Sequence, residues 1–121
     1  MNLQNRREKG NLVEKYVRDY LEKQGMEVVK TNFTCRFGEV DIIAQEDSVM
    51  VFVEVRSRWN NPAYTPEESV TPEKTRRMYR VASYYLQKVV GKEISSRFDL
   101  VTVTLNNSRE IVTLNHLKGI I

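Results

Sequence analysis

Apolar residues recur at helical spacing near the start of the chain. Between about residues 4 and 24 they return every three or four positions, and Gly25 stands where a helix C-terminal cap belongs. The apolar positions are Leu12, Val13, Tyr16, Val17, Tyr20 and Leu21. We therefore predict an amphipathic helix over about residues 4–24, with a charged outer face.

The middle and the end of the chain have the pattern of strands. Short apolar or alternating runs, rich in Val, Ile and Phe, are bounded by polar turn residues. The predicted strands are residues 26–33, 38–44, 49–58, 97–105 and 110–114. The first three are predicted to form a meander, with residues 45–48 as the connection between the second and the third.

A second helix is predicted after an irregular loop at residues 59–70. Thr71 and Pro72 supply an N-cap and a first-turn proline, and an apolar stripe at helical spacing runs on to Gly91. The element order is therefore α-β-β-β-α-β-β. At 121 residues the chain is predicted to form a single domain over residues 1–121, with a core that needs no disulfide.

Three acids interrupt the apolar hairpin of residues 38–58. Because side chains alternate along a strand, Glu39 and Asp41 lie on one face. We predict that Ala44 pairs with Val49 across a four-residue loop. In that register Glu39 lies opposite Glu54, and the three carboxylates gather on the same face of the hairpin.

The opposite face of this hairpin is predicted to be apolar. The same alternation assigns to it Val40, Ile42, Val51, Val53 and Val55. A register slip of one residue would break up this apolar surface, so the hydrophobic pattern itself favours the gathering of the acids.

Clustered carboxylates repel one another unless a cation or a shared proton offsets their charge. Arg56 and Arg58, on the same face as Glu54, could supply that charge and make a solvated ionic surface. Alternatively, the hard oxygens on two rigid strands could form a site for Mg²⁺ or Mn²⁺. The strand pattern alone leaves both interpretations open.

Basic residues at the start of the second predicted helix favour a phosphate-containing partner. Lys74, Arg76, Arg77 and Arg80 lie close in sequence to the loop that leaves the acidic strand. Positive charge beside a carboxylate-held metal is what a phosphodiester substrate requires. A solvated helix face is the alternative for this cluster. The formal net charge of +3 permits a nucleic-acid partner without demanding one.

Composition excludes several other classes of site and location. With Cys35 as its only cysteine and His116 as its only histidine, the chain has no internal disulfide, no multi-thiolate zinc site and no two-histidine mechanism. No run of apolar residues is long enough to span a membrane, and the start of the chain has no secretory pattern. We expect no membrane partner and a cytoplasmic location.

Several ordered segments together resemble the YraN-like family of bacterial proteins. The matching segments are Gly10 with Glu14, residues 38–44 (GEVDIIA), residues 51–58 (VFVEVRSR), Lys74 and residues 97–99 (RFD). That family is similar to the restriction-endonuclease-like, PD-(D/E)xK nuclease superfamily and, in core layout, to archaeal Holliday-junction resolvases. The resemblance implies an α/β fold with a three-layer α/β/α core and a mixed sheet.

The resemblance also implies a set of site residues. Asp41 corresponds to the metal-binding aspartate of the superfamily, Glu54 to its second acid and Arg56 to its lysine. Glu14 and Glu39 would complete the ligands of Mg²⁺ or Mn²⁺. Arginine stays protonated and cannot act as a general base, although it can orient a phosphate.

The implied activity is metal-dependent cleavage of nucleic acid. Arg56 and Lys74 would hold the scissile phosphate, and the nucleic-acid-binding residues would be Arg58, Arg76, Arg77 and Arg80. We expect an endonuclease acting on DNA rather than RNA, on branched or structured DNA in particular, and a homodimer would present two sites. The alternatives are a nucleic-acid-binding module of the same fold with little or no cleavage activity, and an interaction domain whose acids form a surface ion-pair lattice.

Overall fold

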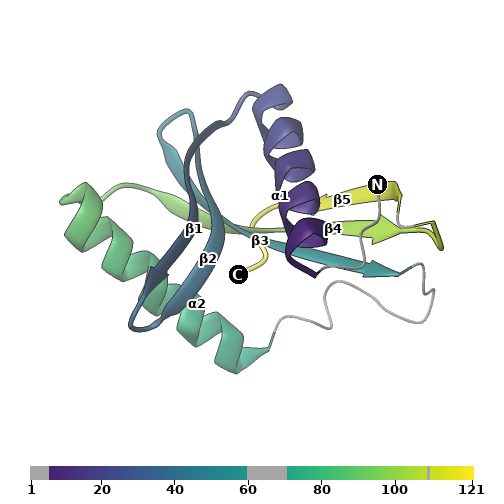
Figure 1. The fold of residues 1–121 in the computed structure, drawn as a ribbon. Coiled ribbons are helices and arrows are strands. Elements are labelled where there is room, and N and C mark those ends of the chain that lie inside the picture. The colour runs from purple at the N-terminus through teal and green to yellow at the C-terminus, as the bar shows by residue number, and fades with distance from the viewer. Residues whose placement is uncertain (1–5, 60–70, 109) are drawn as a thin grey trace.

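The computed structural model describes the backbone of residues 6–59, 71–108 and 110–121 and, within these ranges, the side chains from Leu12 onward except that of Trp59. The elements along the chain are α1 (Arg6–Lys23), β1 (Glu27–Cys35), β2 (Gly38–Glu46), β3 (Val49–Trp59), α2 (Pro72–Tyr85), the π-helical turn η2 (Leu86–Val90), β4 (Ser96–Leu105) and β5 (Ile111–Leu117) (Figure 1). The predicted order of helices and strands is confirmed. The predicted loop over residues 59–70 lies outside the described residues, apart from the backbone of Trp59, which ends β3.

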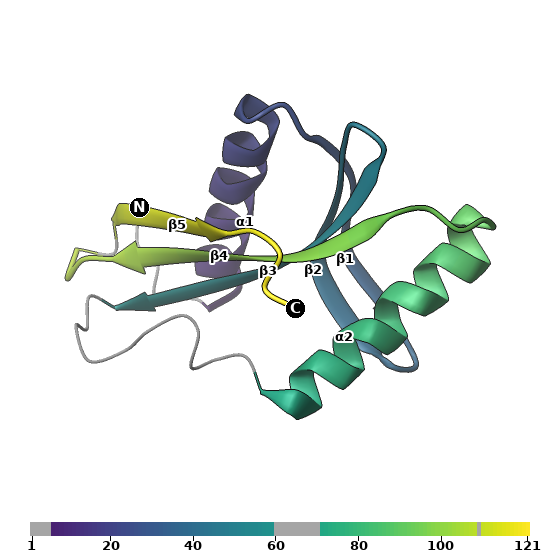
Figure 2. The same cartoon turned by 180° about the vertical axis from the view of Figure 1, so that it is seen from behind.

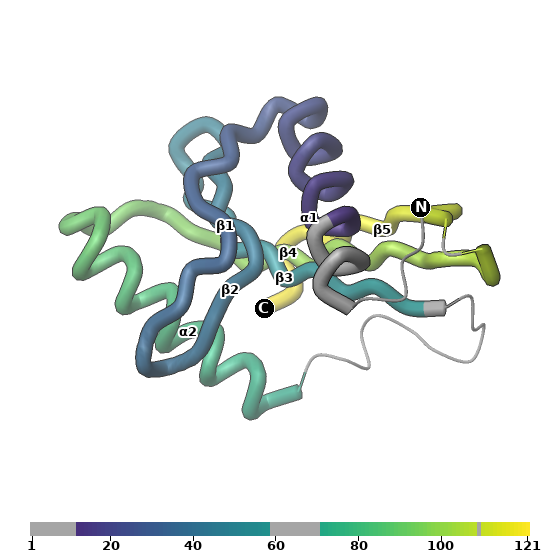
Figure 3. The backbone as a smooth tube through the Cα atoms, in the orientation of Figure 1, coloured from purple at the N-terminus to yellow at the C-terminus, as the bar shows by residue number. Residues whose placement is uncertain are grey.

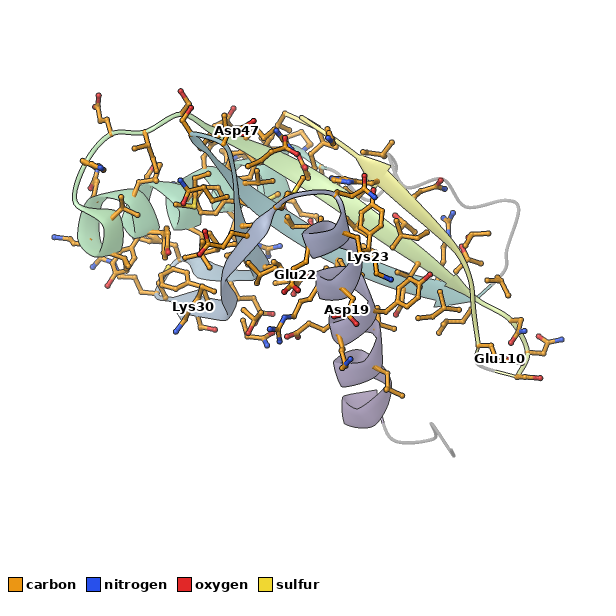
Figure 4. The ribbon with its side chains drawn as sticks, turned by 90° about the horizontal axis from the view of Figure 1, so that it is seen from above. Asp19, Glu22, Lys23, Lys30, Asp47 and Glu110 are labelled. Carbon is orange, nitrogen blue, oxygen red and sulfur yellow. The ribbon has the colours of Figure 1, made fainter. Side chains whose placement is uncertain are left out.

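Both helices form where the local sequence favours them. In α1, Val13, Val17 and Leu21 recur every fourth position and are buried. Its outer face is charged, and Asp19, Glu22 and Lys23 all lie on this exposed side (Figure 4). Within the described ranges, no helix combines the length and the apolar character needed to cross a membrane.

The start of α2 is set by its cap. The Thr71 hydroxyl accepts a hydrogen bond from the backbone N–H of Lys74 at 3.2 Å, and Pro72 occupies the first helical position. The helix continues through η2 to Gly91, whose φ of 79° is readily adopted only by glycine.

The sheet is mixed, as predicted, with the strand order β1-β2-β3-β4-β5. β3 and β4 are parallel, and the other three pairs are antiparallel. The crossover from β3 to the parallel β4 contains α2, which packs on one face of the sheet, while α1 covers the other face (Figures 1 and 2).

The predicted β2–β3 register is wrong by two residues. Ala44 pairs with Val51 rather than with Val49, because the strands run on to Glu46 and Val49 and leave a two-residue turn. Asp47 in this turn has a φ of 54°, which suits the tight hairpin turns whose twist matches the strands. A shift of two residues preserves the predicted alternation of faces over the paired residues, 42–46 with 49–53.

Two apolar clusters pack on the two faces of the sheet. Ile42 and Val53 face α1, whereas Ile43 and Phe52 face α2. Val40 was predicted to share a face with Ile42, but it belongs to the α2-side cluster. The reason is that β2 is paired with β3 only as far as Ile42, and beyond this point β1 and β2 bend together towards α2 (Figure 3).

Candidate functional site

The sheet forks between β2 and β3 at the acidic residues. The last pair in the β2–β3 register is Ile42 with Val53, so Asp41 and Glu54 are the first residues beyond it. There the Asp41 carboxylate takes the place of the next backbone acceptor, because its Oδ2 accepts a hydrogen bond from the Val55 N–H at 2.8 Å. From this point β3 continues beside β4 alone, and Asp41 is held at the centre of the fork.

Asp41 is a half-buried carboxylate with the charges of Glu54 and Glu39 nearby. Burial raises the pKa of the Asp41 carboxyl, while the hydrogen bond from Val55 lowers it. The charges of Glu54 and Glu39 raise this pKa again, and Arg56 opposes them. The resulting pKa lies above the ordinary value for an aspartate. Such a carboxylate would gain from a nearby cation.

Arg56 is paired with one of the acids. Its terminal NH2 group donates a hydrogen bond to Glu54 Oε1, and the two side chains project from the same face of β3 because they are two positions apart. The Arg56 Nε is buried, and no hydrogen-bond acceptor reaches it among the residues that the structure describes. Arg56 therefore keeps an unused donor beside the carboxylates.

The fork opens into a pocket of about 470 Å³, the fork pocket, between the hairpin and α2. Its lining residues are Thr34, Gly38, Glu39, Val40, Asp41, Glu54, Val55, Arg56, Arg77 and Met78. The structure thus brings five of the predicted site residues to one cavity: Glu39, Asp41, Glu54 and Arg56 from the predicted metal and phosphate site, and Arg77 from the predicted nucleic-acid-binding residues.

Lys74, the lysine predicted to reach this site, is absent from the lining of the fork pocket, and the cation that α2 contributes is Arg77. A sequence signal for Arg77 exists, because Arg77 precedes the buried Val81 by four positions and so lies on the same side of the helix. Sequence reasoning grouped Arg77 with the general nucleic-acid-binding residues and did not single it out.

Glu14 also lies outside the fork pocket. Its two carboxylate oxygens accept hydrogen bonds from the Asn32 side-chain amide at 3.2 and 3.0 Å. Asn32 has a φ of 53° and follows Thr31, which pairs with Ile42. This contact anchors α1 to β1 near the level of Asp41, and the role of Glu14 as a metal ligand stays a prediction.

The chemistry of the donors fits a hard divalent cation. In the part of the chain that the structure describes, no three His, Cys, Asp or Glu side chains are grouped so that they could hold a metal ion. Mg²⁺, however, is usually held by one or two protein carboxylates, with waters and substrate phosphates as the other ligands. Asp41 and Glu54, which line the same cavity, match that number of carboxylates.

A second polar cluster, which sequence reasoning missed, lies on the α1 side of the sheet. Asp99 has no exposed surface, and its carboxylate accepts hydrogen bonds from Arg97 Nε at 3.0 Å and from the Gly119 N–H at 3.1 Å. His116 Nε2 lies 2.7 Å from the other Asp99 oxygen. Burial raises the pKa of Asp99, but these hydrogen bonds outweigh burial and hold that pKa below its usual value.

This buried cluster links elements that are distant in sequence. His116 Nδ1 lies 3.0 Å from the Tyr20 hydroxyl on α1, and Arg97 donates a hydrogen bond to Glu46 on β2 at 2.8 Å. With Nε2 protonated towards Asp99, a neutral His116 ring accepts the hydrogen bond from Tyr20. The cluster thereby joins α1, β2, β4, β5 and the residues after β5, and we assign it a structural role.

Comparison with known proteins places this chain in a family. The family described as "Uncharacterised protein family UPF0102" matches residues 13–103. A UPF0102 protein of Caldicellulosiruptor saccharolyticus is 41% identical over 115 residues, which are 95% of this chain and 98% of the relative. A UPF0102 protein of Dichelobacter nodosus is 44% identical, covering 81% of this chain and 78% of the relative, and one of Mycolicibacterium vanbaalenii is 36% identical, covering 97% and 96%. The chain belongs to UPF0102, and the resemblance of its ordered motifs to the YraN-like family is thereby confirmed.

Proposed function

We propose that this protein is a divalent-metal-dependent endonuclease that cleaves DNA, branched or structured DNA in particular, in the fork pocket. The observation that carries the proposal is the position of Asp41 at the fork. Its carboxylate is held by the Val55 N–H, lies beside Glu54, and shares one cavity with Arg56 and Arg77. The similarity of the sequence motifs to the PD-(D/E)xK superfamily supports the same activity.

In this proposal Asp41 and Glu54 hold Mg²⁺ or Mn²⁺. Glu39, which also lines the fork pocket but is not grouped with the other two as a third ligand, is proposed as an acid beside the metal-bound water. Such an ion lowers the pKa of a coordinated water and draws charge from a phosphoryl oxygen. The hydrogen bond from Val55 keeps the Asp41 carboxylate in a fixed orientation, so the site needs little rearrangement before it binds.

The arginines of the fork pocket bind and orient the phosphate. Arg56 has a free Nε donor beside the carboxylates, and Arg77 reaches the same cavity from α2. Guanidinium groups stay charged and donate hydrogen bonds, so both residues stabilise negative charge that develops on phosphate oxygens. Arg56 takes no proton from the nucleophile. Lys74 is proposed as an additional cation for the phosphate, and Arg58, Arg76 and Arg80 as contacts with the nucleic-acid strand.

A nucleic-acid-binding module with little or no cleavage is the second candidate. It is favoured by one observation: Arg56 stands where the superfamily has a lysine and is ion-paired with Glu54. The ion-pair lattice is less favoured, because Glu39, Asp41 and Glu54 line a cavity together with Arg56, whose buried Nε has no acceptor among the described residues. A cytoplasmic location and a homodimer with two fork pockets remain part of the proposal.

The activity is tested with forked, four-way and linear DNA while Mg²⁺ or Mn²⁺ is titrated. Asp41→Asn and Glu54→Gln remove ligand charge with little change of shape, and Glu22→Gln on the exposed side of α1 is the matched control. Metal-dependent cleavage that both site variants lose and the control keeps is expected. Cleavage that persists in both site variants would discard this site, and DNA binding without cleavage would favour the second candidate.

A further inference from the structure

A second pocket, of about 450 Å³, opens next to the fork pocket between the β1–β2 turn and the first turns of α2. Its lining residues are Arg36, Phe37, Glu73, Arg76, Arg77 and Arg80. Four arginines thus face one glutamate, and all four arginines are exposed. None of these four arginines forms an ion pair with a residue in the described part of the chain. The positive charge of this pocket is therefore available to a ligand.

Aromatic contacts in the β1–β2 turn hold Arg36 in place. An arginine that only faces solvent would not need such contacts. The Arg36 guanidinium lies 4.7 Å from the centroid of the Phe37 ring, within the range of a cation–π contact. Phe37 in turn packs edge-on against Tyr84 of α2, with 6.1 Å between the ring centroids. The aromatic pair fixes the turn to α2, so Arg36 is presented towards the arginines of the helix at a low entropic cost.

Arg77 connects this pocket with the fork pocket, because its side chain lines both cavities. It passes directly over Gly38: a Cβ added to Gly38 would lie 3.0 Å from Arg77 Cδ and 3.1 Å from Arg77 Cγ. Gly38 also has a φ of 139°, which side-chain-bearing residues rarely adopt. The absence of a side chain at Gly38 is thus what allows Arg77 to lie between the two cavities.

We infer that Arg36, Arg76, Arg77 and Arg80 form an arginine groove that binds the sugar-phosphate backbone of a nucleic-acid strand and leads it into the fork pocket. The inference rests on the proposed function and adds a path for the substrate. It assigns a binding role to the β1–β2 turn, and it makes Arg77 the junction between backbone binding and the acidic centre. Guanidinium contacts with phosphates carry no sequence information, so binding in the groove is independent of sequence.

A nucleic-acid strand fits this surface better than an anionic membrane does. The arginines line a concavity that continues past Arg77 to the carboxylates of Asp41 and Glu54. A flat anionic bilayer would meet repulsion from these acids at one end of the contact. A linear polyanion can instead follow the groove, with its phosphates on successive arginines and one phosphate at the fork.

The groove is tested by fluorescence anisotropy with a labelled DNA duplex of mixed sequence, in EDTA and over a range of salt concentrations. The variant is Arg36→Ala with Arg80→Ala, and the control is Arg18→Ala, which removes an exposed arginine of α1. Each lost phosphate contact lowers the slope of log affinity against log salt by about 0.9. We expect a slope smaller by about 2 in the double variant, no such loss from the control, and recovery when both positions carry lysine.

Several outcomes would overturn the groove. They are a double variant with the same slope as the control, wild-type protein that does not bind DNA even at low salt, and arginine-dependent binding to anionic lipid vesicles without an effect on DNA. A cleavage assay distinguishes failure of the groove from failure of the nuclease proposal. Metal-dependent cleavage that Asp41→Asn abolishes, with DNA binding unaffected by the double variant, would keep the nuclease and remove the groove. Arginine-dependent DNA binding without cleavage would support the groove and remove the nuclease.

Discussion

The Asp41 carboxylate accepts a hydrogen bond from the backbone N–H of Val55 at 2.8 Å, at the point where β2 and β3 separate. This contact replaces a bond of the β-ladder with a bond to a side chain. It places a carboxylate among the charges of Glu54 and Glu39 and keeps it there. The local cost in electrostatic repulsion is typical of residues retained for function rather than for stability.

Asp41→Asn should separate stability from activity. The asparagine Oδ1 can still accept the hydrogen bond from Val55, while repulsion of Glu54 and Glu39 disappears. We expect a free energy of unfolding higher by about 0.2–1 kcal/mol, the usual size of a cross-strand pair interaction, together with loss of metal-dependent cleavage. Urea denaturation at neutral pH and a cleavage assay measure the two effects. A variant that is clearly less stable would contradict the repulsion inferred at the fork.

Asp99→Ala should be strongly destabilising. It leaves Arg97 and His116 without their buried acceptor, and removal of one partner from a buried ion pair costs about 3–5 kcal/mol. Asp19→Ala is the control, because Asp19 is 54% exposed and, among the described side chains, pairs with Lys15 alone at the surface, where such pairs contribute about 0–1 kcal/mol. Urea denaturation compares the two. Equal losses would mean that the buried cluster contributes no more than a surface pair.

The low pKa of Asp99 predicts acid sensitivity. Because the folded pKa lies below the unfolded value of about 3.9, the unfolded state binds more protons between these two values. Stability is therefore fully present above about pH 4 and falls as the pH falls through the folded pKa of Asp99. The raised pKa of Asp41 acts in the opposite direction, since its protonation at lower pH removes the cost of burying its charge and the repulsion from Glu54 and Glu39.

The measurement is the urea midpoint of wild type and Asp99→Asn between about pH 2 and 5, a window around the ordinary pKa of an aspartate side chain. We expect the wild type to lose more stability than the variant over this interval. Parallel curves would show that Asp99 does not carry the acid sensitivity.

Gly38→Ala should weaken DNA binding as well as the fold. A side chain at a φ of 139° introduces backbone strain of about 1–3 kcal/mol, and its Cβ would meet Arg77 at 3.0 Å. Gly91→Ala provides a matched control, because Gly91 has a φ of 79° and nothing lies within 4 Å of an added Cβ. Both variants should lower the free energy of unfolding, but only Gly38→Ala should reduce DNA affinity. Equal affinities for the two variants would argue against the position assigned to Arg77.

Arg56 should contribute to turnover through its charge. Arg56→Ala is expected to lower the single-turnover rate constant by about 10²–10³-fold, the usual effect of removing a donor that stabilises developing charge. Arg56→Lys keeps the charge and introduces the residue type of the superfamily, so it should retain most of the rate. Arg18→Ala on α1 is the control. A rate for Arg56→Ala equal to that of the control would exclude Arg56 from the reaction.

Local sequence was sufficient to predict the order of the helices and strands and the alternation of side chains over the paired part of β2 and β3. The four-residue spacing of Val13, Val17 and Leu21 predicted α1, and the Thr71 cap predicted where α2 begins. Helix formation and helix capping depend on residues close together in the chain, so the spacing of residues in the sequence predicts them. The predicted register of β2 and β3 was wrong by two residues, but the faces predicted for the paired residues are correct, because side chains on a strand alternate with a period of two.

Contacts between distant segments were beyond such reasoning. The bend that turns Val40 towards α2 depends on where β2 leaves β3, and the choice of Arg77 over Lys74 depends on how α2 rotates against the sheet. His116 was treated as an isolated histidine, because nothing near it in sequence indicates Tyr20, 96 positions away.

The sequence by itself determined the order of helices and strands, the alternation of side chains over the paired part of β2 and β3, and the family. Only the tertiary structure decided that the sheet forks at Asp41 and that a buried cluster stabilises the charge of Asp99. It also decided that Arg77 rather than Lys74 lines the fork pocket. The physical reason is that local propensity and side-chain alternation act within a few residues. The packing of α2 and the separation of β2 from β3, in contrast, are settled by contacts that form once the chain is folded.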